Sequence, residues 1–244
     1  MQNRLISIGK TAKLLGVSID TLRRWDLAGR LPSIRSGPHG HRFYNQSDID
    51  EYLQEVDTIA RNWVEAQEAS EPKPDVYCPT RDVFQARLER LQSKLSRIGS
   101  LNTVSLVTAI AGEVGNNSFD HNLGNWPDIS GIYFAYSVRN RKVVLADRGQ
   151  GILATLQRVR SELTSSEEAM RVAFTETLSG RYPETRGNGL KFVRSIIVDN
   201  TFSLYFQTGN AELHLKQGDT DVTIQQVISS IHGCLAVISF EGAI

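Results

Sequence analysis

The segment that most constrains the fold of this chain is an apolar stretch that ends in a carboxylate followed by two glycines. Residues 132–138 and 142–146 read as two apolar strands joined at Arg139-Asn140-Arg141, which predicts a β-hairpin. The second strand runs directly into Asp147, Gly149 and Gly151. A carboxylate there can accept a hydrogen bond from a flat ligand, and glycines lack the Cβ atoms that would block its approach. Alone, such a motif is more often a simple turn.

A predicted helix that begins near Leu101 carries a polar row beside its apolar stripe. Glu113, Asn117 and His121 recur at every fourth position, so they lie on one side of the helix. A carboxylate, an amide and an imidazole beside an apolar seam are costly to bury without partners. The row therefore predicts a binding site. A further amphipathic helix is predicted over residues 81–97.

A third motif consists of glycines that open a helix. Residues 186–190, with Gly187 and Gly189, precede a predicted helix that extends through Ile197. Glycines at a helix start expose backbone N–H groups and the positive end of the dipole, which suits a phosphate. In this order, the three motifs resemble the N, G1 and G2 boxes of the GHKL ATPase superfamily. The resemblance covers about residues 100–240.

The GHKL resemblance implies a two-layer α/β sandwich of the Bergerat type that binds ATP and Mg²⁺. It implies that Asn117 ligates Mg²⁺, that Asp147 accepts a hydrogen bond from the adenine amino group, and that Glu113 activates water. The resemblance also places His121 among the nucleotide contacts, at a position that is often polar in anti-sigma-type members. The alternative is that His121 only orients a neighbouring site residue. The other nucleotide contacts that it implies are Gly149, Gly151, Arg186, Gly187, Gly189 and Lys191.

Cys234 departs from the superfamily pattern. Members carry a Gly-Thr pair whose hydroxyl supports the adenine-binding aspartate, and the best match here is Gly233-Cys234, which has no such hydroxyl. Cys78 and Cys234 show no metal-binding spacing, so we expect buried thiols. The segment between Leu178 and Gly187, which corresponds to the lid over the nucleotide in this superfamily, is short. Its length argues against a gyrase-like member, since those proteins add a second catalytic domain.

The N-terminal segment is strongly basic although the whole chain has a formal net charge of zero. Through Gln46 it holds eight basic and two acidic residues, a net charge of +6. Two short helices are predicted over 8–15 and 19–28, separated by a turn at Gly16, and a hairpin is predicted over 34–44. Helix, tight turn and helix is the arrangement that places a second helix in the DNA major groove.

Residues 8–18, 21–25, 29–31 and 40–44 make this segment resemble the MerR/excisionase winged-helix family, over about residues 5–55. In that family the second helix reads the major groove and the wing grips the backbone. The carried-over DNA contacts are Thr21, Arg23, Arg24, His41 and Arg42. For each arginine the alternative is a solvated surface charge. The effector domain of metal- or drug-sensing members is replaced here by other sequence.

A helix is predicted over residues 47–69, and two prolines at 72 and 74 indicate a linker after it. Its apolar seam is either a coiled-coil dimer contact or a face that packs on its own domain. The seam consists of Leu53, Val56, Ala60, Trp63 and Gln67. We therefore expect an α+β protein with a winged helix-turn-helix at 1–55, a helix and linker at 56–80, and an ATP-binding domain at 81–244.

Three functions fit these motifs. The first is a DNA-binding transcriptional regulator with an ATP site that acts as a nucleotide-dependent switch. The second is a serine/threonine protein kinase, similar to anti-sigma-factor kinases, that acts on a partner protein. The third is an adaptor with a decayed site, against which the intact motifs argue. A self-phosphorylating histidine kinase is disfavoured, since residues 47–112 contain no histidine. Expected partners are double-stranded DNA, ATP, a regulatory protein and, if the seam pairs, a second copy. Without a signal peptide or membrane-length apolar run, we expect a cytoplasmic protein.

Overall fold

The computed structural model describes residues 4–15, 17–29, 31–36, 40–46, 48–49, 56–138, 140–176 and 188–240. The chain forms two compact units, Met1–Val56 and Asp57–Ile244. Several predicted features lie outside the described residues: the turn at Gly16, the hairpin tip at 37–39, Leu53 of the helix seam, and residues 177–187 with Arg186 and Gly187.

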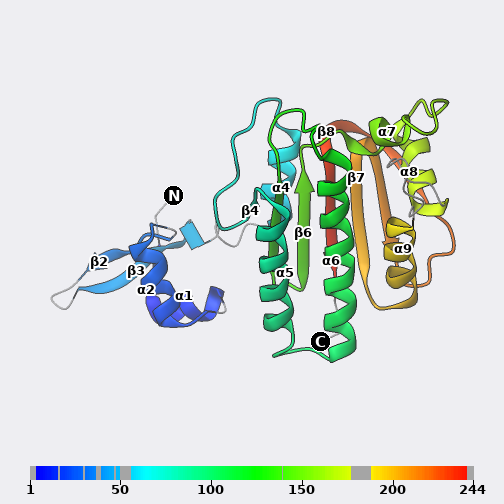
Figure 1. Ribbon diagram of the computed structural model, residues 1–244. Coiled ribbons are helices and arrows are strands. Elements are labelled where there is room, and N and C mark those ends of the chain that lie inside the picture. Colours follow the sequence, from blue (N-terminus) through cyan, green and yellow to red (C-terminus); the bar gives the residue numbers. More distant parts are fainter. Residues whose placement is uncertain are drawn as a thin grey trace. The chain divides into compact units, whose positions relative to one another are not determined.

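The first unit is a helix-turn-helix with a three-stranded antiparallel sheet (Figure 1). Its elements are β1 (Leu5–Ser7), α1 (Ile8–Leu15), α2 (Ile19–Leu27), β2 (Ile34–Ser36) and β3 (His41–Asn45), with sheet order β1-β3-β2. Ser18 caps α2, since its hydroxyl accepts a 3.0 Å hydrogen bond from the Thr21 backbone N–H. The two predicted helices and the strands of the predicted hairpin are confirmed. Strand β1 was not predicted from the sequence.

The core of this unit fixes how α2 meets the sheet. Leu22 and Tyr44 are fully buried, and the Tyr44 hydroxyl donates to the Leu22 carbonyl at 3.3 Å. Trp25 packs against the same cluster. Because Leu22 and Trp25 face inward, Arg23 and Arg24 between them face solvent.

The second unit surrounds a five-stranded sheet in the order β4-β5-β6-β8-β7, all antiparallel. Its strands are β4 (Tyr77–Cys78), β5 (Ile132–Ser137), β6 (Lys142–Asp147), β7 (Ser203–Lys216) and β8 (Ile224–Ser239). Its helices are α4 (Val56–Glu65), α5 (Arg81–Leu95), α6 (Leu101–Asn122), α7 (Gly151–Leu156), α8 (Ser166–Thr175) and α9 (Gly189–Asp199).

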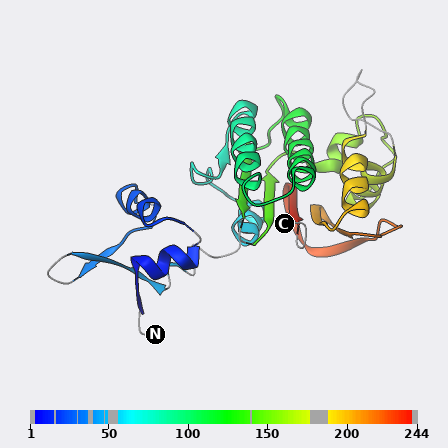
Figure 2. The same cartoon turned by 90° about the horizontal axis from the view of Figure 1, so that it is seen from below.

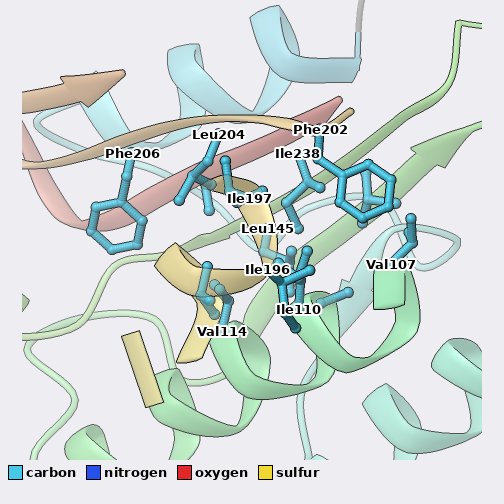
Figure 3. Close-up of a cluster of buried hydrophobic side chains, with 14 of the residues drawn as sticks. Val107, Ile110, Val114, Leu145, Ile196, Ile197, Phe202, Leu204, Phe206 and Ile238 are labelled. Atoms are coloured by element: carbon cyan, nitrogen blue, oxygen red, sulfur yellow. The ribbon is translucent and has the colours of Figure 1, made fainter. Parts of the chain in front are cut away.

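One face of this sheet packs against α5, α6 and α9 (Figures 1 and 2). Successive side chains of a strand point to opposite faces, so alternate apolar residues of β5, β6, β7 and β8 enter this core. Figure 3 shows part of it, formed by Val107, Ile110, Val114, Leu145, Ile196, Ile197, Phe202, Leu204, Phe206 and Ile238.

The opposite face of the sheet is covered by α4. Trp63 packs on Tyr133 of β5 with ring centroids 6.4 Å apart, and Ala60 and Val64 are fully buried. Lys142 of β6 forms a 3.3 Å ion pair with Asp57. Ala60 and Trp63 of the predicted seam are therefore buried within their own unit. α4 adds a third layer to the expected two-layer sandwich, and it belongs to the second compact unit.

Among the described residues, no helix is long and apolar enough to cross a membrane.

Candidate functional site

A cavity of about 700 Å³ in the second unit brings together residues from the three sequence motifs. α6 contributes Glu113, Asn117 and His121, β6 contributes Asp147, and Gly189 lies at the start of α9. Volumes of this size are typical of small-molecule sites. Three segments that are distant in sequence therefore line one cavity.

Gly189 lies directly against the polar row of α6. A Cβ atom at this position would stand 1.9 Å from Glu113 Oε1 and 3.0 Å from Asn117 Nδ2. Any side chain at 189 would therefore displace the Glu113 carboxylate. Because position 189 is glycine, the first turn of α9, with its exposed N–H groups, comes close to both polar side chains.

Asp147 lines the cavity, and hydrogen bonds hold both of its carboxylate oxygens. Its side chain is only 2% exposed, Ser118 Oγ donates to Oδ2 at 2.7 Å, and the Gly149 N–H donates to Oδ1 at 2.9 Å. Burial raises the pKa of this carboxyl above its ordinary value, and these hydrogen bonds oppose the rise. The result is a fixed acceptor at an enclosed site.

The hydroxyl that position 234 lacks is supplied from elsewhere. Cys234 lies opposite Asp147 in the sheet, and the carboxylate takes its hydroxyl donor from Ser118 of α6. A second hydroxyl, that of Thr208, donates to the Gly233 carbonyl at 2.9 Å and accepts from the Ile152 N–H at 3.2 Å. Ser118 therefore gives the Asp147 carboxylate a hydroxyl donor that Cys234 cannot provide.

The two cysteines are far less acidic than free thiols. Burial raises the pKa of Cys78 to about 11 and that of Cys234 well above its ordinary value. Cys78 is fully buried, whereas Cys234 is half-buried and lines the cavity. Neither thiol is activated as a nucleophile.

Asn122 is a site residue that sequence reasoning missed. Its Oδ1 accepts from the Gln150 N–H at 2.8 Å, and its Nδ2 donates to the Ser118 carbonyl at 2.8 Å. A Cβ at Gly149 would stand 2.1 Å from Asn122 Nδ2, so Gly149 is required by this contact. The sequence offered one signal for Asn122: it follows Ser118 by four positions, so the two residues lie on the same side of the helix. Gly151, with φ of 75°, does line the cavity.

Two further observations concern the expected phosphate neighbours. Lys191 of α9 is half-buried and is not among the described residues that line the cavity, and Arg186 and Gly187 lie outside the described part of the chain. Arg81 lines the cavity and pairs with Asp120. This ion pair was not predicted.

In the first unit, the candidate DNA contacts on α2 are held by local hydrogen bonds. Arg23 pairs with Asp20 at 2.9 Å on the surface, and Arg24 Nη2 donates to Thr21 Oγ1 at 3.4 Å. Exposed pairs of this kind are weak and easily exchanged for a phosphate or base. His41 is exposed on β3.

Arg42 differs from Arg23 and Arg24 because its ion-pair partner is mostly buried. Its Nε donates to Asp26 Oδ2 at 2.7 Å, and the two side chains are only 19% and 14% exposed. Asp26 also accepts from the Ser33 N–H at 2.8 Å. The Arg42 hydrogen bond is the main cause that lowers the pKa of Asp26 to about 2. Arg42 therefore fastens the end of α2 to the wing, a role that the sequence prediction did not include.

Comparison with known proteins gives two matches. Residues 7–44 match the family model described as MerR family regulatory protein. The chain is also 23% identical, over 223 residues, to the Type II methyltransferase M.Eco47II of Escherichia coli, an alignment that covers 82% of this chain and 50% of the relative. The chain thus spans about half the length of this curated relative. The first unit carries a MerR-like helix-turn-helix, which indicates a DNA-binding regulator.

Proposed function

We propose that this protein is a DNA-binding transcriptional regulator whose second unit binds ATP with Mg²⁺ and acts as a nucleotide-dependent switch. The observation that carries the proposal is that one cavity holds a buried carboxylate acceptor, Asp147, and a polar pair, Glu113 and Asn117, packed against the start of α9. The first group suits an adenine amino group, and the second suits phosphates with a divalent cation. The resemblance to GHKL ATPases supports the same assignment.

The adenine end of the site depends on Asp147. The Ser118 hydroxyl and the Gly149 N–H fix its two oxygens, so the carboxylate is already oriented before a ligand arrives. An exocyclic amino group that donates to a fixed, buried carboxylate forms a charge-assisted hydrogen bond, which is stronger than a neutral one. This preorganisation favours adenine over bases without an amino group at that position.

The phosphate end depends on α6 and α9. Mg²⁺ prefers oxygen ligands and binds through one or two side chains together with phosphate oxygens. The Asn117 side-chain oxygen fits that role, and Glu113, which lines the same cavity, would orient and deprotonate a water molecule. Bound Mg²⁺ would supply charge neutralisation for the phosphates. The positive end of the α9 dipole favours the same anion.

The printed name of the curated relative describes a methyltransferase, and adenosyl methyl donors share the adenine ring with ATP. Asp147 alone does not distinguish these ligands. The contact of Gly189 with Glu113 and Asn117 favours a ligand with phosphates, because a sulfonium donor carries one carboxylate but no phosphate chain for Mg²⁺ and the start of α9. We therefore propose ATP and include S-adenosylmethionine as a competing ligand in the final test.

For DNA, we propose that α2 enters the major groove with Thr21, Arg23 and Arg24, and that the wing contacts phosphates through His41 and the exposed part of Arg42. The MerR-like match over residues 7–44 and the charge of +6 through Gln46 support this assignment. The Arg42–Asp26 ion pair keeps the wing in place.

Labelled ATP tests the proposed switch and separates it from phosphate transfer. The wild-type protein and Asn117→Ala are incubated with γ-labelled ATP and Mg²⁺, alone and with cell lysate, and Asn125→Ala, an exposed asparagine beyond α6, is the matched control. The switch predicts retention of ATP with little turnover in wild type and control, and loss in Asn117→Ala. Label on a second protein would favour the kinase, and no retention by wild type would refute ATP binding.

A further inference from the structure

Arg148, which lies between the site residues Asp147 and Gly149, is fully buried. Its guanidinium faces away from the cavity, because neighbouring residues at the end of a strand point to opposite faces. Nε donates to Asp128 Oδ2 at 2.7 Å, and Nη2 approaches the same oxygen at 2.7 Å. This charge is therefore paired at one edge of the guanidinium.

The other edge of the guanidinium holds the carboxyl-terminal end of α4. Nη1 donates to the carbonyl oxygens of Trp63 at 2.6 Å and Ala66 at 2.8 Å, and Nη2 donates to that of Gln67 at 3.3 Å. The last carbonyls of a helix lack partners within the helix and form the negative end of its dipole. A buried arginine thus binds one carbonyl of the last turn of α4 and two carbonyls of the segment that follows it, and all three guanidinium nitrogens have an acceptor.

A second anchor of α4 follows the same pattern. Thr208 of β7 lies on the same side of its strand as Phe206, which lines the cavity, and its hydroxyl holds the Gly233 carbonyl and the Ile152 N–H. Its neighbour Gln207 faces the other way and accepts a 2.9 Å hydrogen bond from Arg61 of α4. The end of β6 and the strand β7 therefore each have one residue on the cavity side of the sheet, Asp147 or Thr208. The adjacent residue, Arg148 or Gln207, binds α4 on the other side.

We propose that Arg148 couples occupancy of the cavity to the docking of α4 and, through α4, couples nucleotide binding to DNA binding. α4 begins at Val56, where the first compact unit ends, so it is the first element of the second unit. The proposal rests on the proposed ATP and DNA binding and adds how the one regulates the other.

The coupling has a definite physical origin. The Gly149 N–H is bonded to Asp147, so a ligand that engages this carboxylate also restrains the turn that carries Arg148. A fully buried guanidinium cannot give up its acceptors without leaving an unpaired charge, so the turn and the end of α4 shift together. A ligand with different affinities for two arrangements of this turn shifts their populations.

Thermodynamic linkage makes the proposal quantitative. If ATP changes DNA affinity by some factor, DNA must change ATP affinity by the same factor, and such factors are typically about 5- to 150-fold. We expect at least about a fivefold effect in both directions. Because ratios of affinities are compared, a general loss of affinity in a variant does not mimic a loss of coupling.

The test measures both affinities, each with and without the other ligand, for the full chain and a short duplex selected from a random-sequence pool. The variants are Arg148→Ala, Arg148→Lys and, as control, Arg90→Ala, an exposed arginine on α5. We expect equal factors in wild type and control, a factor near one in Arg148→Ala, and partial coupling in Arg148→Lys. Unchanged coupling in Arg148→Ala would overturn the proposal. Wild type that binds both ligands independently would also overturn it but leave the proposed binding intact, whereas wild type that binds no ATP refutes both.

A measurement on wild type alone decides the matter if Arg148→Ala does not fold. Amide hydrogen exchange is recorded with and without saturating ATP and Mg²⁺. Added protection is expected both in residues 113–122, which line the cavity, and in residues 60–68 at the end of α4. Protection of 113–122 without any change in 60–68 would show that the nucleotide acts only locally, and the coupling would be rejected.

Discussion

Ser118 Oγ donates a 2.7 Å hydrogen bond to Asp147 Oδ2, which ties the middle of α6 to the end of β6. The two residues are separated by 29 positions in the sequence. This contact supplies the hydroxyl that Cys234 lacks on the neighbouring strand. In the proposed ATP site, it gives α6 a part in the adenine end in addition to the phosphate end, where Glu113 and Asn117 lie.

Ser118→Ala should therefore weaken ATP binding by about tenfold, since a hydrogen bond to a charged group contributes about 1.5–3 kcal/mol. It should also shift the pH dependence. The bond lowers the pKa of Asp147, so its loss raises that pKa, and binding that needs the ionised carboxylate is lost at a higher pH as the pH falls. ATP titrations across the acidic range check both effects. Ser96→Ala, at the exposed end of α5, should match wild type; equal pH profiles for both variants would contradict the assignment.

Gly189→Ala tests the meeting of α9 with the polar row of α6. The new methyl group would stand 1.9 Å from Glu113 Oε1 and must push the carboxylate aside. We expect ATP affinity and any turnover to fall at least about tenfold. The melting temperature should change little, because the Glu113 carboxylate is at the end of a flexible side chain and can move aside. Gly9→Ala, where a Cβ meets no atom within 4 Å, is the control. Normal ATP affinity in Gly189→Ala would remove α9 from the binding site.

Glu113→Ala should separate binding from chemistry. The variant keeps Asp147 and Asn117, so it should retain ATP with nearly the wild-type affinity but lose whatever slow hydrolysis the wild type has. Filter binding and phosphate release, measured on the same preparation, give both quantities. Hydrolysis at the wild-type rate would remove Glu113 from the role of general base.

The Arg42–Asp26 ion pair should stabilise the first unit. Arg42→Ala leaves a partly buried carboxylate with fewer donors and should cost about 1–3 kcal/mol of unfolding free energy. Asp26 has a pKa lowered from 3.8 to about 2, so its contribution is complete above pH 3.8 and is lost as the pH falls towards 2. The difference between wild type and variant should shrink over that range in denaturant titrations. Arg35→Ala, opposite Arg42 in the hairpin and exposed, is the control; an equal cost for both arginines would refute the special role of Arg42.

Much of the architecture could be predicted from local pattern. The helices of the first unit, the hairpin of β5 and β6, and the row of Glu113, Asn117 and His121 follow from periodicity, capping and turn residues within short windows. Capping also acts within a short window at α8, where the Ser165 hydroxyl accepts a 3.2 Å hydrogen bond from the Glu168 N–H. Gly189 was recognised because glycines at a helix start have a local meaning.

The remainder depends on contacts between distant segments. Nothing near Ser118 in sequence indicates that its hydroxyl meets Asp147, and nothing near Arg148 indicates that it binds the end of α4. The seam of α4 was equally compatible with a dimer contact, because an apolar stripe does not specify what covers it. The long strand β7 was missed, although it carries Thr208. Arg42 was assigned to DNA alone because its partner Asp26 lies 16 residues away.

We propose that the second unit binds ATP with Mg²⁺ through Asp147, and isothermal titration calorimetry measures this binding itself. Wild type and Asp147→Asn are titrated with ATP in the presence of Mg²⁺, with ATP and a chelator, and with S-adenosylmethionine. We expect saturable, Mg²⁺-dependent ATP binding by wild type, binding weaker by at least about tenfold in Asp147→Asn, and little binding of S-adenosylmethionine. Equal ATP affinity in the two proteins, or tighter binding of S-adenosylmethionine than of ATP, would contradict it.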